Sequence, residues 1–492
     1  MYTVKKLVIC MAIASAFPAA CMAQAAPSQK SEIEALKKQV KELQAMMQKI
    51  TLQNSQSSAL AAETSAQVLS IVESSKQAIQ AIQADKSNVV DVTEFNRIRV
   101  KTEAMDEAIE ANGFRALKIS GYIDPTYVYN RNGKTSSFVF FNNNSSINGS
   151  NESFGYDNSS FGSGMFNMEK ELDGGTKFKL TLMPSKSSAS SNNFGNLVHE
   201  ASVSIPLYEP ATRLIAGQLP DWTGYEAIPA PQNKLITHNL LFDFSAASFY
   251  TGAGVDLLRG AWDSKIMIGN MNRARVDVAK QQMPGVFYRV DYTQDEFSSF
   301  GFSGIHSGFD DKLDSGRLDL VEIDGSLTRG DWNFQAQLSY GRQSATPTNA
   351  YLNERQHWYG LSSLASYKVS PRLDATARFD YINNARHGGG LFGSTFGGVC
   401  KDSTGADASC PDGRNGFGSN MSYDGSNWIV SNPDRGSNRS ALSLGLSYAL
   451  LTGVSIKGEY RFDHSNAHVF KTADEQYTQS NHLFALSTVI SF

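Results

Sequence analysis

Charged residues recur at alternate positions in several stretches of this chain. They are Arg289 and Asp291, Arg372 and Asp374, Arg378 and Asp380, and the series Lys457, Glu459, Arg461 and Asp463. Residues two apart in an extended strand share one face, so each stretch would display mixed charge on a single side. Such a face can bind water, ions and polar solutes electrostatically, without any covalent step.

A second group of candidate residues lies in the segment 220–249. Its acids are Asp221, Glu226 and Asp243, and its rings belong to Trp222, Tyr225, His238, Phe242 and Phe244. Rings beside carboxylates could stack on a sugar, or they could pack the segment against a wall. We favour packing for most of the rings, and we expect Asp221 and Glu226, on either side of Gly224, to carry charge into a lumen.

The elements that would position these charges are long alternating strands. In "VSIKGEYRF", residues 454–462, apolar residues and glycine occupy one face and Ser, Lys, Glu and Arg the other. "PRLDATARFDY" and "DWNFQAQLSY" follow the same pattern. The runs are about 9 to 13 residues long, which suits a tilted strand crossing a bilayer rather than a soluble strand of about 5 or 6. Aromatic residues near the run ends, Trp332 with Tyr340 and Trp358 with Tyr367, fit two interfacial girdles.

Sixteen such strands are predicted. They are 116–130, 161–172, 175–184, 197–206, 210–219, 250–259, 261–270, 284–293, 297–306, 318–328, 331–342, 356–369, 371–383, 438–450, 453–464 and 480–492. Tight connections alternate with long ones, and 384–437 is the longest. We therefore predict an all-β transmembrane barrel of about 16 antiparallel strands over 116–492, preceded by an α-helical coiled coil. The even count would put both barrel ends on the short-turn side.

The N-terminal part has a different organisation. Residues 1–23 have the charged, apolar and small-residue regions of a signal peptide, cleaved after residue 23 or 25; an uncleaved anchor or a lipid on Cys21 are the alternatives. Over 24–82, apolar residues from Ile33 to Ile50 follow a 3/4 spacing that favours a self-associating coiled coil over a single packed helix. The segment 83–115 is expected to be a helical linker.

Composition narrows the partners and the compartment. The formal charge is −4, so no nucleic-acid-binding surface is indicated. Cys400 and Cys410 would be the cysteines left after cleavage at residue 23, and in an exported chain they most simply form a disulfide. We expect no metal site and no cofactor.

Catalytic motifs are weak. No G-x-S-x-G occurs, "HEASV" lacks the second histidine of H-E-x-x-H, and "GGGLFG" at 388–393 falls within the longest predicted loop. A chance Ser, His and Asp meeting in a lumen stays possible in principle, but the sequence gives no reason to expect an enzyme.

The signal peptide, the sixteen strands, the alternating turns and loops, and the terminal Phe492 resemble the trimeric general and substrate-selective bacterial porins. The loop 220–249 matches in order the loop that narrows the lumen of such porins, and the coiled coil resembles the periplasmic extension of sucrose-type porins. The region around "GQLPDWTGYEAIPAPQNKLITHNLLFDF" is also similar to an uncharacterised porin-like proteobacterial family. No clear arginine ladder of the phosphate-selective type is present.

This resemblance implies passive diffusion of small hydrophilic solutes through a trimer in the outer membrane, in contact with lipid and lipopolysaccharide. It implies that Phe492 closes the barrel and is read by the barrel-assembly machinery. Wall charges Arg289, Arg372, Arg378, Lys457 and Arg461 would face the loop acids Asp221, Glu226 and Asp243. They either neutralise one another as solvated wall residues or set up a transverse field. The alternative functions are a structural tether through the coiled coil or an adhesin presenting 384–437.

Overall fold

A computed structural model describes residues 96–104, 116–141, 154, 161–184, 197–245, 249–272, 284–308, 317–343, 356–384, 396–401, 407–411, 419–432 and 435–492. The predicted signal peptide and coiled coil lie outside these residues. The predicted linker 83–115 is described only at 96–104, which is helical. The chain divides into units 1–88 and 89–492, and all the described residues belong to the second.

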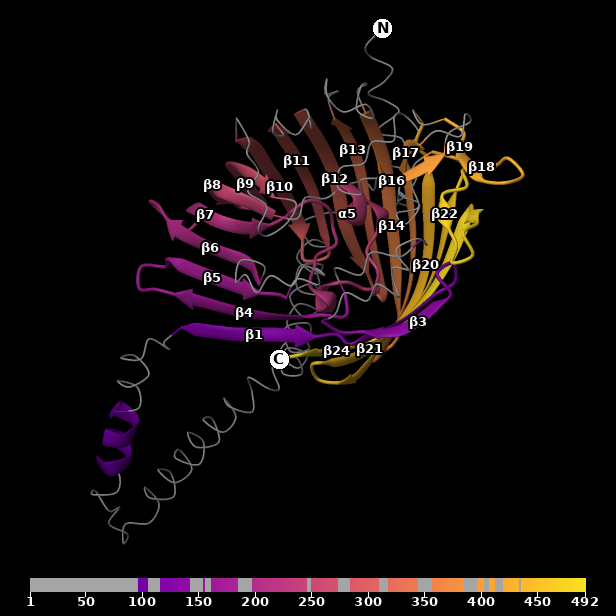
Figure 1. Ribbon diagram of the computed structural model, residues 1–492. Coiled ribbons are helices and arrows are strands. Elements are labelled where there is room, and N and C mark those ends of the chain that lie inside the picture. Colours follow the sequence, from indigo (N-terminus) through magenta and orange to yellow (C-terminus); the bar gives the residue numbers. More distant parts are fainter. Residues whose placement is uncertain are drawn as a thin grey trace, which may run out of the picture. The chain divides into compact units, whose positions relative to one another are not determined.

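The described part is dominated by a single closed sheet of 18 strands (Figure 1). Its strands are β1 (Leu117–Ile123), β2 (Thr126–Asn130), β3 (Thr135–Val139), β4 (Gly164–Glu171), β5 (Lys177–Leu182), β6 (Val198–Pro206), β7 (Thr212–Pro220), β8 (Phe249–Arg259), β9 (Trp262–Asn272), β10 (Gly285–Asp295), β11 (Ser298–Gly308), β12 (Arg317–Arg329), β13 (Trp332–Gln343), β14 (Gln356–Ser370), β15 (Leu373–Asn383), β20 (Arg439–Leu451), β21 (Val454–Ser465) and β24 (Ser480–Ser491). Each strand pairs antiparallel with its neighbours. The sheet is therefore an antiparallel β-barrel, as predicted.

The barrel crosses sixteen times, and these crossings correspond to the sixteen predicted strands. β1 and β2 form one crossing, interrupted at Asp124 and Pro125, and β3 is a hairpin arm that pairs with β2. The interruption has a local cause, because Pro125 has no backbone N–H to donate. At this interruption the Asp124 carboxylate accepts hydrogen bonds from the backbone N–H groups of Gly162 and Ser163. Within the barrel sheet, the arm β3 is the strand that was not predicted from the sequence.

The last strand closes the barrel on the first. Tyr122 pairs with Ser491 and Thr126 pairs with Ser487. Phe492 and Gly121 exchange two backbone hydrogen bonds of 3.0 Å each. Closure by the C-terminal strand is thus confirmed, with Gly121 rather than Ile119 opposite the terminal residue.

The two faces of the strands follow the predicted alternation. On β24 the side chains of Phe484, Leu486 and Ile490 are exposed on the outer surface, whereas Ala485 and Val489 are buried inside. One aromatic prediction is wrong. Trp358 is 1% exposed and lies against lumen-facing Gly341, because it stands an odd number of residues from outward-facing Tyr367. Its neighbour Tyr359 occupies the outer surface instead.

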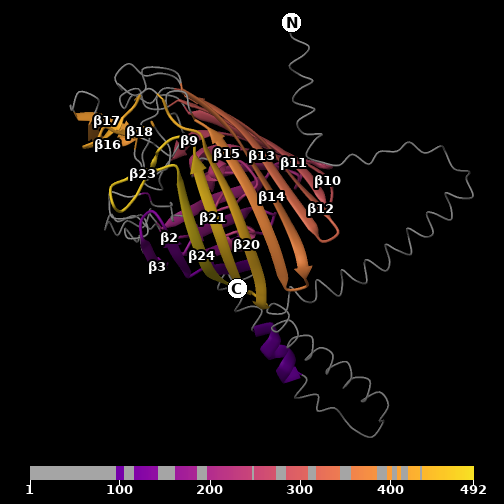
Figure 2. The ribbon, with the colours of Figure 1, turned by 90° about the vertical axis from the view of Figure 1, so that its right-hand side faces the viewer.

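The connections differ at the two ends of the barrel. Tight turns at one end contain glycines with positive φ, such as Gly330 at 57° and Gly453 at 72°, a conformation that other residues adopt at a cost. The opposite end carries the long connections and two small sheets, β16 (Phe396–Lys401) to β19 (Trp428–Val430) and β22 (Phe470–Lys471) with β23 (Tyr477–Thr478) (Figure 2). Leu117 and Phe492 both lie at the short-turn end, as the even count predicts.

Cys400 lies on β16 and Cys410 on β17 (Asp407–Pro411), which pair antiparallel. Their side chains are outside the described part, so the disulfide stays a prediction. Among the residues that the structure describes, no helix has the length and apolar character needed to cross a membrane.

Candidate functional site

The segment between β7 and β8 runs inside the barrel. It contains a short 3-10 turn, η2 (Ala230–Gln232), and the helix α5 (Leu240–Ser245), which lies within the curve of the sheet (Figure 1). We call residues 221–245 the lumen loop. Asn239 caps α5 by accepting a hydrogen bond of 2.8 Å from the backbone N–H of Phe242. The loop predicted at 220–249 is thus placed in the lumen.

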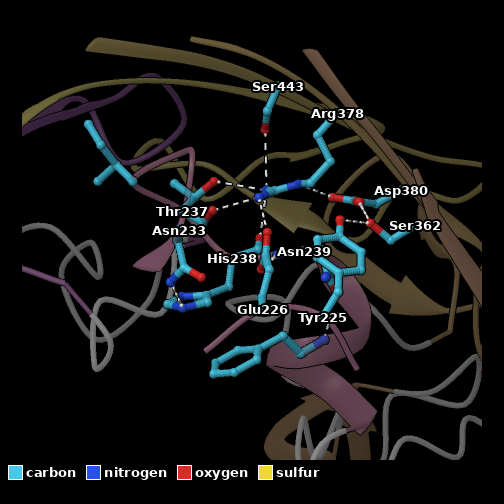
Figure 3. Close-up of polar contacts among 12 residues, drawn as sticks. Tyr225, Glu226, Asn233, Thr237, His238, Asn239, Ser362, Arg378, Asp380 and Ser443 are labelled. Carbon is cyan, nitrogen blue, oxygen red and sulfur yellow. Dashed lines mark hydrogen bonds and ion pairs between the residues drawn. The ribbon is translucent and has the colours of Figure 1, made fainter. Parts of the chain in front are cut away.

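Arg378 on β15 is the centre of the contact between wall and loop (Figure 3). Its guanidinium lies 2.8 Å from Glu226 of the loop and 3.0 Å from Asp380 of its own strand. It also donates to the backbone carbonyls of Thr237 and His238 at 2.7 and 2.8 Å. The side chains of Arg378 and Glu226 are 0% and 4% exposed, so this ion pair is buried and multiply hydrogen-bonded.

The charged series on β21 provides a second set of loop contacts. Glu459 accepts hydrogen bonds from the backbone N–H groups of Ile236 and Thr237 at 2.7 and 2.8 Å. Arg461 donates to the carbonyl of His238 at 2.7 Å, and Lys457 donates to the carbonyl of Ala230 at 2.7 Å. These wall charges are therefore bound to the loop backbone, not dispersed along a solvated wall.

Arg289 on β10 holds the beginning of the loop. It donates to the carbonyls of Trp222 and Gly224 at 2.8 and 3.3 Å and pairs with Asp324 at 2.9 Å. A Cβ on Gly301 would lie 2.7 Å from the Asp324 carboxylate, so the glycine leaves room for this pair. Arg289, Arg378, Lys457 and Arg461 all face the lumen, as predicted.

Arg372 is the exception among the predicted lining residues. It lies in the exposed turn between β14 and β15 and is not part of a strand. Its alternate neighbour Asp374 does face inward and pairs with Lys234 of the loop at 3.3 Å. Arg372 was predicted to face the lumen from its alternation with Asp374, but the strand begins only at Leu373.

Two of the three loop acids contact wall residues, Asp221 through Tyr250 and Glu226 through Arg378. Asp221 accepts hydrogen bonds from Thr223 and from Tyr250 of β8, and burial raises its pKa from 3.8 to about 6. Burial also raises the pKa of Glu226 from 4.5 to about 7, with Arg378 opposing the rise. Asp243 lies in the first turn of α5 and is partly buried. Asp221 and Glu226 thus hold the loop in place and do not project into open water.

Apolar contacts fit the loop to the wall. A Cβ on lumen-facing Gly360 would lie 2.6 Å from Leu241 of α5, and one on Gly445 would collide with Leu235. We call Gly360 and Gly445 the glycine sockets. The aromatic residues also pack: His238 stacks on Phe242 at 4.0 Å, as expected for most of these rings.

A cavity of about 300 Å³ lies on the opposite side of the lumen, beside the start of the loop. Leu219 and Trp222 border it on the loop side. Its charged lining residues are Glu169, Lys177, Lys179, Glu200, Asp256 and Lys265, from β4, β5, β6, β8 and β9. Lys179 pairs with Glu200 at 2.8 Å yet is 43% exposed, so its ammonium group remains hydrated. We call this space the lumen cavity.

The model of the family described as "Protein of unknown function (DUF3138)" matches residues 4–285 and 303–492. The chain belongs to this family. A search of curated proteins finds no match.

Solved structures similar to this DUF3138 protein include three outer-membrane proteins. The anion-selective porin from Comamonas acidovorans is 11% identical, with a TM-score of 0.45 and coverage of 76% of this chain and 99% of the porin. The outer membrane channel DcaP of Acinetobacter baumannii is 10% identical, with a TM-score of 0.46 and coverage of 76% and 97%. OmpT of Vibrio cholerae is 12% identical, with a TM-score of 0.44 and coverage of 76% and 97%.

Several residues of the site were missed in the sequence. Thr237 and Asn233 bind wall and loop groups, the glycine sockets receive leucines, and the lysines of the lumen cavity were not singled out. The capping role of Asn239 before "LLFDFS" could have been inferred from the sequence, since Asn is a preferred residue at the N-cap position of a helix. The sockets left no local signal, because a socket glycine cannot be told from any other glycine of the wall until the loop is docked.

Proposed function

We propose that this DUF3138 protein forms a water-filled pore in the bacterial outer membrane, through which small hydrophilic solutes and ions diffuse passively. The observation that carries the proposal is the asymmetry of the lumen. The lumen loop is bound to the wall from β10 to β21, and the lumen cavity with its hydrated lysines and carboxylates lies against β4 to β9. The loop would narrow the pore without filling it.

The outer surface supports a position within a bilayer. Leu338, Leu444, Leu446, Phe379 and Phe484 are exposed there between aromatic residues at the two ends. Trp332 and Tyr367 pack at 4.7 Å near the short turns, and Tyr340 and Tyr359 are exposed near the long connections. An apolar band between two aromatic girdles is the surface that a transmembrane barrel needs.

The orientation follows from the difference between the short turns and the long connections. With short turns in the periplasm, Leu117 and Phe492 face the periplasm and the long loops face outward. In this arrangement the predicted coiled coil would hang in the periplasm, Phe492 would reach the barrel-assembly machinery, and the barrel would associate as a homotrimer. No enzymatic step is included in the proposal.

The charges of the lumen cavity support weak ion selectivity. Lys177, Lys179 and Lys265 stand among Glu169, Glu200 and Asp256, so neither sign prevails in this space. Neutralising lysines there should change selectivity, because a charge that lines a water-filled passage acts directly on passing ions.

Planar-bilayer recording tests the proposal. The purified protein should conduct, and Lys179→Gln with Lys265→Gln should shift the reversal potential in a salt gradient towards cation preference. Lys170→Gln is the matched control, since Lys170 lies on the outer face beside inward-facing Glu169. Failure to conduct under any condition would reject the pore and favour the tether or adhesin. Deleting 31–82 then separates these, because only a tether should lose envelope attachment.

A further inference from the structure

A cluster of basic residues lies on the outer surface of the barrel, at the long-loop ends of β11 to β14. It consists of His306, Arg317, Arg342 and His357, with Asp319 between them. Alternation places these side chains outside, because Ile305, Leu318, Leu320 and Trp358 beside them are buried in the lumen. Register brings the cluster together, since His306 pairs with Asp319, Asp319 with Arg342, and Arg342 with His357.

Asp319 organises the cluster. Arg317 Nε lies 3.1 Å from its carboxylate, Arg342 Nε lies 2.9 Å from it, and His306 Nδ1 lies 2.8 Å from it. The Asp319 side chain is 13% exposed, whereas Arg317 is 65% and Arg342 is 47% exposed. Each guanidinium has five N–H donors, and Asp319 takes only those on one edge of each. The acid thus holds two arginines side by side with their remaining donors directed outward.

The cluster stands immediately beyond the aromatic residues of the outer surface. Tyr340 precedes Arg342 by two residues on β13, and Tyr359 follows His357 by two on β14; both tyrosines are about half exposed. Tyr288 reaches His306 Nε2 at 3.3 Å. Residues two apart are separated by about 7 Å along a strand. If the tyrosines lie at the boundary of the hydrocarbon, the arginines lie at the depth of the lipid headgroups.

We propose that this cluster binds phosphate groups of lipopolysaccharide in the outer leaflet. The planar guanidinium group of arginine matches phosphate oxygens with two parallel hydrogen bonds, and basic residues near an anionic membrane surface are attracted to it. Two arginines against one aspartate leave a net positive charge even with both histidines neutral. The inference rests on the proposed outer-membrane position and orientation, but not on conduction.

A small anion from solution is a poorer fit than a headgroup. The donors open sideways onto the membrane-facing surface and not into the lumen or a closed pocket. The apolar surface directly below, which includes Phe302 and Ile323, offers contact for acyl chains at the same time. A lipid that joins phosphate and acyl chains in one molecule satisfies both surfaces.

Native mass spectrometry of the detergent-solubilised protein with added bisphosphorylated lipid A tests the proposal. Arg317→Gln with Arg342→Gln should weaken lipid binding about 10- to 30-fold, from about 1 kcal/mol for each arginine. Arg259→Gln with Lys368→Gln, exposed charges at the short-turn end, should leave binding unchanged. Arg317→Gln alone should weaken it less, and it keeps Arg342 on Asp319 if the double variant folds poorly.

Three results would overturn the proposal. Equal loss in the control pair would show charge attraction without a site. Equal binding of dephosphorylated lipid would remove phosphate from the recognition. Complete competition by about 10 mM inorganic phosphate would assign the arginines to a free anion. Conductance of the double variant should equal that of the wild type, so loss of the pore and loss of the lipid site are recorded separately.

Discussion

Gly121 and Phe492 meet across the closing seam of the barrel, joined by two backbone hydrogen bonds of 3.0 Å. A Cβ on Gly121 would lie 2.7 Å from the tip of the Phe492 ring, so the ring lies directly over the glycine. The terminal aromatic residue therefore covers the one position on the first strand that has no side chain of its own.

Removing this contact should impair closure. We expect Gly121→Ala to lower the midpoint of heat-induced unfolding, because the added methyl group would lie 2.5 Å from the carbonyl oxygen of Met165 as well as 2.7 Å from the Phe492 ring, and overpacking typically costs about 1–3 kcal/mol. Heat-modifiable mobility on electrophoresis measures the folded fraction. Gly121→Ala keeps Phe492 as a signal for assembly, whereas Phe492→Ala removes both roles. A closing contact is contradicted if Gly121→Ala is indistinguishable from wild type while Phe492→Ala fails to fold.

Arg378 should be the strongest single anchor of the lumen loop. Arg378→Met leaves Glu226 and Asp380 without their buried cation, and breaking such a pair costs about 3–5 kcal/mol. We expect faster proteolysis within 221–245 and larger open-channel noise. Arg372→Met is the control, because its exposed turn position should shift stability by less than about 0.5 kcal/mol. Equal behaviour of the two variants would show that the loop is held elsewhere.

Loop docking should weaken as pH rises. Glu226 and Asp221 have pKa values of about 7 and about 6 when docked, above their ordinary values of 4.5 and 3.8, because both are buried. An acid with a raised pKa binds its proton more tightly in the docked state, so the contribution of these two acids to docking is largest at low pH and is lost as pH rises through these ranges. His238 of the same loop acts in the opposite direction, because burial lowers its pKa from 6.5. The raised pKa of each acid corresponds to roughly 3 kcal/mol of docking free energy that is lost when the acid ionises.

Single-channel recording between pH 5 and pH 8 measures this effect as an increase in loop noise. Glu226→Gln with Asp221→Asn should flatten the pH dependence while leaving ion preference nearly unchanged, since neither acid projects into open water. A large change in cation preference would instead restore the transverse-field interpretation of these acids.

The glycine sockets should accept no side chain. Gly360→Val and Gly445→Val place atoms where Leu241 and Leu235 now lie, so the loop must move away from the wall and conductance should change. Gly458→Ala is a matched control on β21, because a Cβ there would find its nearest neighbour only at 3.9 Å. An unchanged conductance in both socket variants would mean that the leucines repack without moving the loop.

Much of the fold was predictable because alternation is a local property. Each strand shows its two faces within about ten residues, so strand count, lumen-facing parity and the closing role of Phe492 could be inferred along the chain. Trp358 and Arg372 show the limit of this reasoning. A single misjudged position reverses a face, and a strand that begins at Leu373, two residues later than predicted, leaves Arg372 in a turn and not in the wall.

The sequence by itself determined the barrel, its sixteen crossings and, with exceptions such as Trp358, which residues face inward. Only the tertiary structure decided what those residues do. Glu226 and Arg378 are 152 positions apart, and Leu235 of the lumen loop meets Gly445 on the still more distant strand β20, so no local pattern records these contacts. The same holds for the basic cluster on β11 to β14, where strand register places residues from four strands side by side. The sequence does not distinguish the inward-facing charges from one another, because the burial and pairing of each charge depend on which part of the wall the lumen loop contacts, and not on spacing along the chain.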